Sequence, residues 1–90
     1  MIRADVYYKV ACFLEDFAKY DGALNIFSEA LLHYTNAAQN MAVAKTNYAI
    51  ARIYSTLGRY QEAEQAMLQT LDVYARGPFA HLLFFIHTFG

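Results

Sequence analysis

Apolar residues recur at helical spacing along most of the chain, and this pattern predicts four helices at about 4–18, 21–34, 40–57 and 60–76. In the first helix the apolar stripe consists of Val6, Val10, Phe13, Leu14 and Phe17. In the second helix it consists of Leu24, Phe27, Ala30 and Leu31. Few breaks interrupt the pattern, since the 90 residues hold only four Gly and one Pro.

Residues that start and stop helices lie between these segments. Asp21 is placed to cap the second helix or to favour its positive N-terminal end. Gly58 tolerates the left-handed conformation in which many helices end, and Gly77-Pro78 is a strong stop for the fourth helix. A polar stretch at 35–40 marks the connection between the second and third helices. The chain is therefore expected to be all-α.

The sequence repeats itself at an offset of 40 residues. FAKYDGALNIFSEAL (17–31) aligns with LGRYQEAEQAMLQTL (57–71), and the alignment extends without a gap in both directions. The identical pairs are Ala4 and Ala44, Tyr8 and Tyr48, Ala11 and Ala51, Tyr20 and Tyr60, Ala23 and Ala63, Leu31 and Leu71, and Tyr34 and Tyr74. The unit that repeats is a pair of helices, so the pattern predicts stacked helical hairpins.

The repeated positions resemble the tetratricopeptide repeat. The second copy carries the pattern at Ala51, Tyr54, Gly58, Tyr60, Ala63, Met67 and Leu71, and the first copy at Ala11, Leu14, Ala18, Tyr20, Ala23, Phe27, Ala30 and Leu31. Ala18 departs from the usual turn glycine, and Tyr7 and Asn47 occupy positions where Trp is common in the family. The 40-residue offset exceeds the usual repeat of about 34 residues. It is similar to the longer repeats of kinesin light chains and spindle-orientation adaptors.

This resemblance implies one domain, 1–90, in which two antiparallel helix–turn–helix repeats stack as a short right-handed superhelix. Repeat 1 is expected at 4–38 and repeat 2 at 40–76, followed by a short C-terminal helix. Helices that pack closely need small side chains where they cross. We expect Ala11 to face Ala23 and Ala51 to face Ala63. Larger residues are expected to fill the gap to the next helix, namely Tyr20, Phe27, Tyr60 and Met67.

Helix A is the first helix of each repeat. The apolar C-terminal segment, 79–90, is interpreted as a truncated third A helix or a capping tail. Two repeats are fewer than the three that such stacks usually need, which favours a tail that packs on the fourth helix. The alternatives are an apolar face that joins a partner or a second copy of the chain, a shallow membrane contact, and an artificial chain end. The residues expected to form this end-face contact are Leu82, Leu83, Phe84 and Phe85.

Composition and charge argue against several classes of function. A net charge of −1 gives no field that would attract nucleic acid. A single cysteine, Cys12, and the lack of a signal-like start favour the cytoplasm. The histidines are His33, His81 and His87, and none has metal-ligand spacing, so neither a metal nor another cofactor is expected. Cys12 has no base beside it in sequence, and no catalytic motif occurs. We expect a protein without enzymatic activity.

A binding surface is the favoured function. In tetratricopeptide repeats the A helices line the inner wall, and the resemblance assigns partner contacts to Asp5, Tyr8, Cys12, Lys45, Tyr48, Arg52 and Ser55. It also assigns outward positions to Glu15, Asp16 and Thr56. Lys45 and Arg52 are expected to face the acidic residues of the first repeat, although these groups could simply be solvated or pair between helices. The expected partner is a protein or peptide. The alternative function is a small structural subunit, buried in a larger assembly through its apolar tail.

Overall fold

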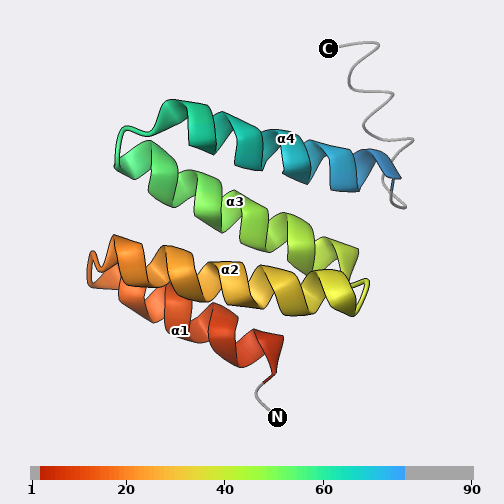
Figure 1. The fold of residues 1–90 in the computed structure, drawn as a ribbon, viewed down its shortest axis with the longest axis horizontal. Helices are drawn as coiled ribbons and strands as arrows, with labels where there is room; N and C mark the ends of the chain where they lie inside the picture. The colour runs from red at the N-terminus through yellow and green to blue at the C-terminus, as the bar shows by residue number, and fades with distance from the viewer. Residues whose placement is uncertain (1–2, 77–90) are drawn as a thin grey trace.

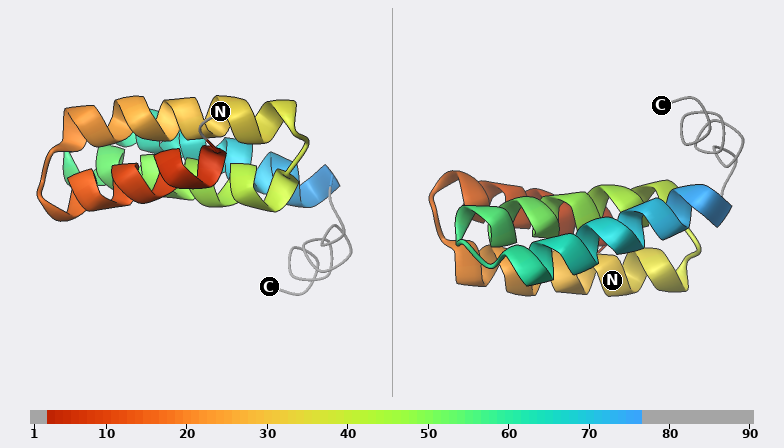
Figure 2. Two further views of the ribbon diagram at one scale, coloured as in Figure 1. Left: turned by 90° about the horizontal axis from the view of Figure 1, so that it is seen from below. Right: turned by 90° about the horizontal axis from the view of Figure 1, so that it is seen from above.

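The computed structural model describes residues 3–76, which form four antiparallel helices. They are α1 (Ala4–Asp16), α2 (Tyr20–Asn36), α3 (Asn40–Thr56) and α4 (Tyr60–Arg76). The helices lie side by side in chain order, with α1 and α4 at opposite ends of the row (Figure 1). Seen from the other directions, α1 and α3 lie on one side and α2 on the other, and α4 crosses obliquely beside α3 (Figure 2). The predicted all-α hairpin stack is confirmed, and each predicted helix boundary is within three residues of the observed one.

The three connections have the same geometry at intervals of 20 residues. Each contains one residue with positive φ, namely Ala18 (58°), Ala38 (55°) and Gly58 (76°). Each also has paired backbone hydrogen bonds onto the helix before it, such as Lys19 N–H to the Leu14 carbonyl at 2.8 Å. This left-handed ending satisfies carbonyl groups in the last turn of a helix. The expectation for Gly58 is confirmed, and Ala18 adopts the glycine-like conformation despite its Cβ.

The start of α2 differs slightly from the prediction. Lys19, rather than Asp21, is the N-cap residue, and no side chain caps the helix by a hydrogen bond. Asp21 lies in the first turn, where its carboxylate interacts favourably with the positive end of the helix dipole.

Small residues allow close packing within each hairpin. Ala11 and Ala23 are fully buried in α1 and α2, and Ala51 and Ala63 are almost fully buried in α3 and α4. Between the hairpins, the fully buried Phe27 of α2 belongs to the same core cluster as residues of α3. Packing runs from α1 to α2, from α2 to α3, and from α3 to α4. The expected roles of the alanines and of Phe27 agree with this burial.

Most of the apolar stripe of the first helix does not pack on other residues of the described range 3–76. Val6 and Val10 are 49% and 44% exposed, and Phe13 and Phe17 are 61% and 63% exposed. Leu14 alone among the stripe residues is partly buried, against the core cluster. The residues that hold α1 to α2 are instead Ala11 and its neighbours, because the stripe lies on the opposite side of the helix.

Two further expectations concern the C-terminal end. Tyr60 is 71% exposed, because no helix among residues 3–76 follows α4 to cover it. The predicted end-face residues, Leu82, Leu83, Phe84 and Phe85, lie outside the described residues, as does the predicted short C-terminal helix. Within the described part of the chain, no helix combines the length and hydropathy needed to cross a bilayer.

Candidate partner-binding face

Side chains of α1 and α3 meet on the side of the molecule that these two helices share. We call this surface the α1–α3 face and define it by Tyr8, Glu15, Lys45, Tyr48 and Arg52. Tyr8 and Tyr48 occupy equivalent places in the two repeats, one on each helix. Because α1 and α3 both pack on α2, the long side chains of this face cross from one helix to the other.

Tyr8 is the inner anchor of the face. Its ring meets the ring of buried Phe27 edge-on, with centroids 5.3 Å apart. The Lys45 ammonium lies 4.5 Å from the centroid of the Tyr8 ring, a cation–π contact between α3 and α1. Burial raises the pKa of the Tyr8 hydroxyl, and neighbouring Cys12 adds to this rise. Cys12 itself is a half-buried free thiol.

Arg52 makes the strongest polar link across the face. Its Nε and Nη2 donate to the two carboxylate oxygens of Glu15 at 2.7 and 2.6 Å. This two-point hydrogen bond raises the pKa of Arg52. The guanidinium also lies 5.9 Å from the centroid of the Tyr48 ring. Tyr48 remains 54% exposed, so its ring is available to a ligand while Arg52 holds one side of it.

The other predicted partner-binding residues have different surroundings. The Tyr34 hydroxyl of α2 donates to the Asp5 carboxylate, so Asp5 links α1 to α2. Burial, and then this hydrogen bond, raise the pKa of Tyr34 to about 12. Ser55 is exposed in the last turn of α3, and Asp16 is exposed at the end of α1. The structure therefore brings Tyr8, Cys12, Lys45, Tyr48 and Arg52 together and leaves Asp5 and Ser55 at the margins.

The expected separation of charge across the face is reduced by pairing. Glu15 and Arg52 neutralise each other, and the Glu15 side chain is only 16% exposed. Lys45 has no acidic partner among the described residues and contacts a neutral ring instead. The face thus presents one exposed aromatic ring, one cation held on a tyrosine and one ion pair that spans two helices.

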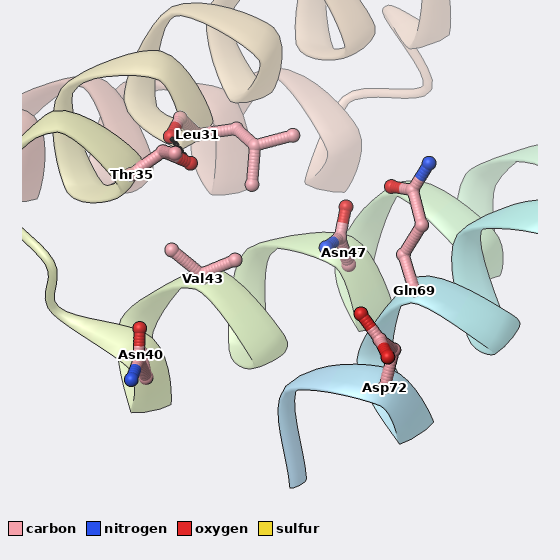
Figure 3. A pocket seen from close by; sticks show the side chains of 7 residues that line it. All are labelled: Leu31, Thr35, Asn40, Val43, Asn47, Gln69 and Asp72. Carbon is pink, nitrogen blue, oxygen red and sulfur yellow. Dashed lines mark hydrogen bonds between the residues drawn. The ribbon is translucent and has the colours of Figure 1, made fainter. Parts of the chain in front are cut away.

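A hollow on the other side of the molecule was not predicted. It has a volume of about 320 Å³ and lies among α2, α3 and α4, with Leu31 and Val43 as apolar lining (Figure 3). Asn47 projects from α3 toward this hollow and is only 4% exposed. No hydrogen bond to its amide is found among residues 3–76. The signal in the sequence was an Asn at a helix position where its neighbours Val43 and Ile50 are apolar.

The described residues contain no group of three or more His, Cys, Asp or Glu side chains that could hold a metal ion. The α1–α3 face offers aromatic surface, cation–π contacts and charge-assisted hydrogen bonds.

Comparisons with known proteins agree with the helical geometry. The family model described as tetratricopeptide repeat matches residues 3–76. A TPR repeat-containing protein of Dictyostelium discoideum is 30% identical over 76 residues, which cover 84% of this chain and 5% of that protein. This chain therefore spans a small part of that relative's length. No solved structure gives a significant match. Since the family model spans all four helices, the chain belongs to the tetratricopeptide repeat family.

Proposed function

We propose that this chain is a non-catalytic adaptor module that holds a partner peptide on the α1–α3 face. Membership of the family supports a role in protein–protein interaction in general. The observation that carries the more specific proposal is the half-exposed ring of Tyr48 beside the Arg52 guanidinium. Tyrosine and arginine are among the residue types enriched at the positions that contribute most to binding energy at protein interfaces.

The contacts of the face indicate the chemistry of the partner. An aromatic or aliphatic side chain of the peptide would cover the exposed ring of Tyr48. A carboxylate of the peptide would approach Lys45, which has no acidic partner among the described residues, or would share Arg52 with Glu15. An extended segment with an apolar residue beside acidic ones therefore fits the α3 half of this face best. Tyr8 contributes less directly, because its ring is already packed on Phe27.

A peptide library displayed on phage tests this proposal without a known partner. Peptides selected on the whole chain should bind the Tyr48→Ala variant at least about tenfold more weakly, as is usual for an aromatic residue at the centre of an interface. Arg52→Glu should weaken them as well and should select against acidic residues. Tyr60→Ala is the matched control, because Tyr60 is an exposed tyrosine of α4 away from this face.

Helicity measured by circular dichroism should be the same in all three variants. Selected peptides that bind Tyr48→Ala as well as the original chain, or that lose affinity only with Tyr60→Ala, would place the binding site elsewhere.

A further inference from the structure

The outer face of α1 is apolar, and no other helix among residues 3–76 covers it. Val6, Val10, Phe13 and Phe17 form this surface, which we call the α1 outer face. The rings of Phe13 and Phe17 lie against each other, with centroids 4.8 Å apart, so the apolar surface is continuous. Contiguous apolar surface on a soluble chain usually marks a contact site.

The equivalent residues of the second repeat show which kind of neighbour covers this face when one is present. The residues of α3 that correspond to Val6, Val10 and Phe13 are Thr46, Ile50 and Ile53, at an offset of 40. They are 0%, 8% and 0% exposed, because α3 has a neighbouring helix on each side. The α1 outer face has the same position and a more apolar composition, but no helix among residues 3–76 covers it. A helix is therefore the occupant that fits.

The spacing of the four residues favours a particular kind of helix pair. Steps of four, three and four residues are those of the two core positions in a heptad repeat. Lys9 and Asp16 lie seven residues apart on one edge of this face, and both are exposed. Neither forms an ion pair with another described residue. The face thus carries one positive and one negative charge along the same edge.

We propose that the α1 outer face pairs antiparallel with the same face of a second copy of this chain. About a twofold axis between Val10 and Phe13, each Val10 lies opposite Phe13 of the second copy, and each Val6 lies opposite its Phe17. Every layer then holds one Val and one Phe, which gives layers of equal width. Lys9 comes opposite Asp16 of the second copy, and the twofold axis repeats this ion pair.

Other arrangements satisfy fewer of these constraints. A parallel pair would place Phe opposite Phe and Val opposite Val, and it would bring Lys9 beside Leu14 instead of an acid. Stacking of α4 from a second copy on α1 would extend the row of helices, and such head-to-tail contacts form open chains. In the antiparallel pair, by contrast, the assembly is closed and the edge charges Lys9 and Asp16 are complementary.

Charge reversal on the whole 90-residue chain tests the proposal. We expect sedimentation velocity to show a reversible monomer–dimer equilibrium. Lys9→Glu or Asp16→Lys should each weaken dimerisation by about tenfold, since each introduces two like-charge contacts. The double variant should restore dimerisation. Lys19→Glu is the matched control, because it changes the net charge equally in the connection after α1.

Apolar substitutions separate this arrangement from the head-to-tail alternative. Val10→Ser should abolish the dimer, whereas Leu68→Ser, at a comparably exposed position of α4, should leave it intact. A chain that is monomeric at all accessible concentrations overturns the proposal. A dimer that is lost with Leu68→Ser, or a double charge variant that fails to restore association, also overturns it.

Cross-linking tests the direction of the helices. In a Cys12→Ser background, a mixture of Val10→Cys and Phe13→Cys chains should form a disulfide between the two variants, and neither variant should form one alone. Disulfides formed by each variant alone would indicate parallel helices and contradict the antiparallel pair.

Discussion

Arg52 and Glu15 join the two repeats through a pair of hydrogen bonds of 2.7 and 2.6 Å, from the C-terminal part of α3 to the end of α1. The two residues are separated by 37 positions in sequence, and their helices do not follow one another in the packing order. This contact therefore links non-adjacent helices, whereas the most extensive helix–helix packing is between neighbours.

A double-mutant cycle measures the value of this ion pair. We expect Arg52→Ala and Glu15→Ala to show a coupling energy of about 0.5–1 kcal/mol in urea unfolding, because the geometry is two-pronged but Arg52 is partly solvated. Added salt should reduce the coupling. The pair Arg59 and Glu62 is a useful control, since it also makes two hydrogen bonds but lies within one connection and its following turn. A coupling no larger than that of the control would contradict a role in joining the repeats.

Tyr34 should make stability depend on pH in the alkaline range. Its pKa is raised to about 12 in the folded chain, above an ordinary value of 10.0. The folded state thus favours the protonated hydroxyl, so the stabilisation is complete below about pH 10 and is lost as pH rises through about 12. This rise in pKa corresponds to about 2–3 kcal/mol of unfolding free energy that is lost when Tyr34 ionises.

The matched variant for this titration is Tyr34→Phe, which removes the ionisable group and keeps the ring. The difference in unfolding free energy between the two proteins should decrease, and then change sign, between about pH 10 and pH 12. At lower pH the original chain should be more stable by about 1 kcal/mol, from the hydrogen bond to Asp5. A difference that stays constant across this range would show that Tyr34 does not titrate in this way.

The two alanines with positive φ should be sites of easy stabilisation. Ala18→Gly and Ala38→Gly should each raise the free energy of unfolding by about 1 kcal/mol, because glycine adopts the left-handed conformation without a Cβ conflict. Gly58→Ala should lower it by a similar amount. An added Cβ at Gly58 would meet no atom within 4 Å, so the cost would be conformational. Thermal or urea unfolding would measure all three, and equal stabilities would contradict this account.

Asn47 should be replaceable by an apolar residue with a gain in stability. The Asn47 residue is 4% exposed, and no buried polar side-chain atom among the described residues lacks a hydrogen-bond partner, so its amide meets solvent through the adjoining hollow, which has room for a larger side chain. Asn47→Leu should raise the unfolding free energy by about 1 kcal/mol, because the leucine side chain would fill part of the hollow with buried apolar surface. Asn40→Leu, an exposed lining residue of the same hollow, should change it by less than about 0.5 kcal/mol. A destabilised Asn47→Leu variant would indicate that the amide has a structural role.

The fold was predictable because the repeat and the helix periodicity agree. Small residues at equivalent positions, such as Ala11 and Ala51, were assigned to helix crossings, and they are buried there. The left-handed end of α3 was expected from Gly58, whereas the second connection was expected only as a polar stretch at 35–40, and the positive φ of Ala38 was not predicted. Periodicity does not show whether a neighbouring helix is present, so the exposure of Val10 and Phe13 was not predicted. Tyr60 is exposed for the same reason.

The surroundings of the site residues were less predictable than their positions. Their assignment as partner contacts came from the resemblance to tetratricopeptide repeats, and Tyr8 and Tyr48 lie at equivalent places in α1 and α3. The hydrogen bond from Arg52 to Glu15 depends on how far a long side chain reaches from one helix to another. Residue spacing along a single helix does not give that distance. Pairing of charges between helices was one of the alternatives that the sequence left open, and Arg52 and Glu15 form such a pair.

The linear order of helix packing has a consequence for how the molecule unfolds locally. Each helix is held by its neighbours in the row, and α2 and α3 have a neighbour on both sides whereas α1 has a neighbour on one side. Opening events should therefore begin at an end and move inward, as in a one-dimensional lattice with nearest-neighbour coupling. Backbone amides of α1 should exchange with solvent deuterium sooner than those of α2 and α3. The hydrogen bonds from Arg52 to Glu15 should oppose this opening, because they join the end of α1 to α3, whose amides are expected to exchange more slowly.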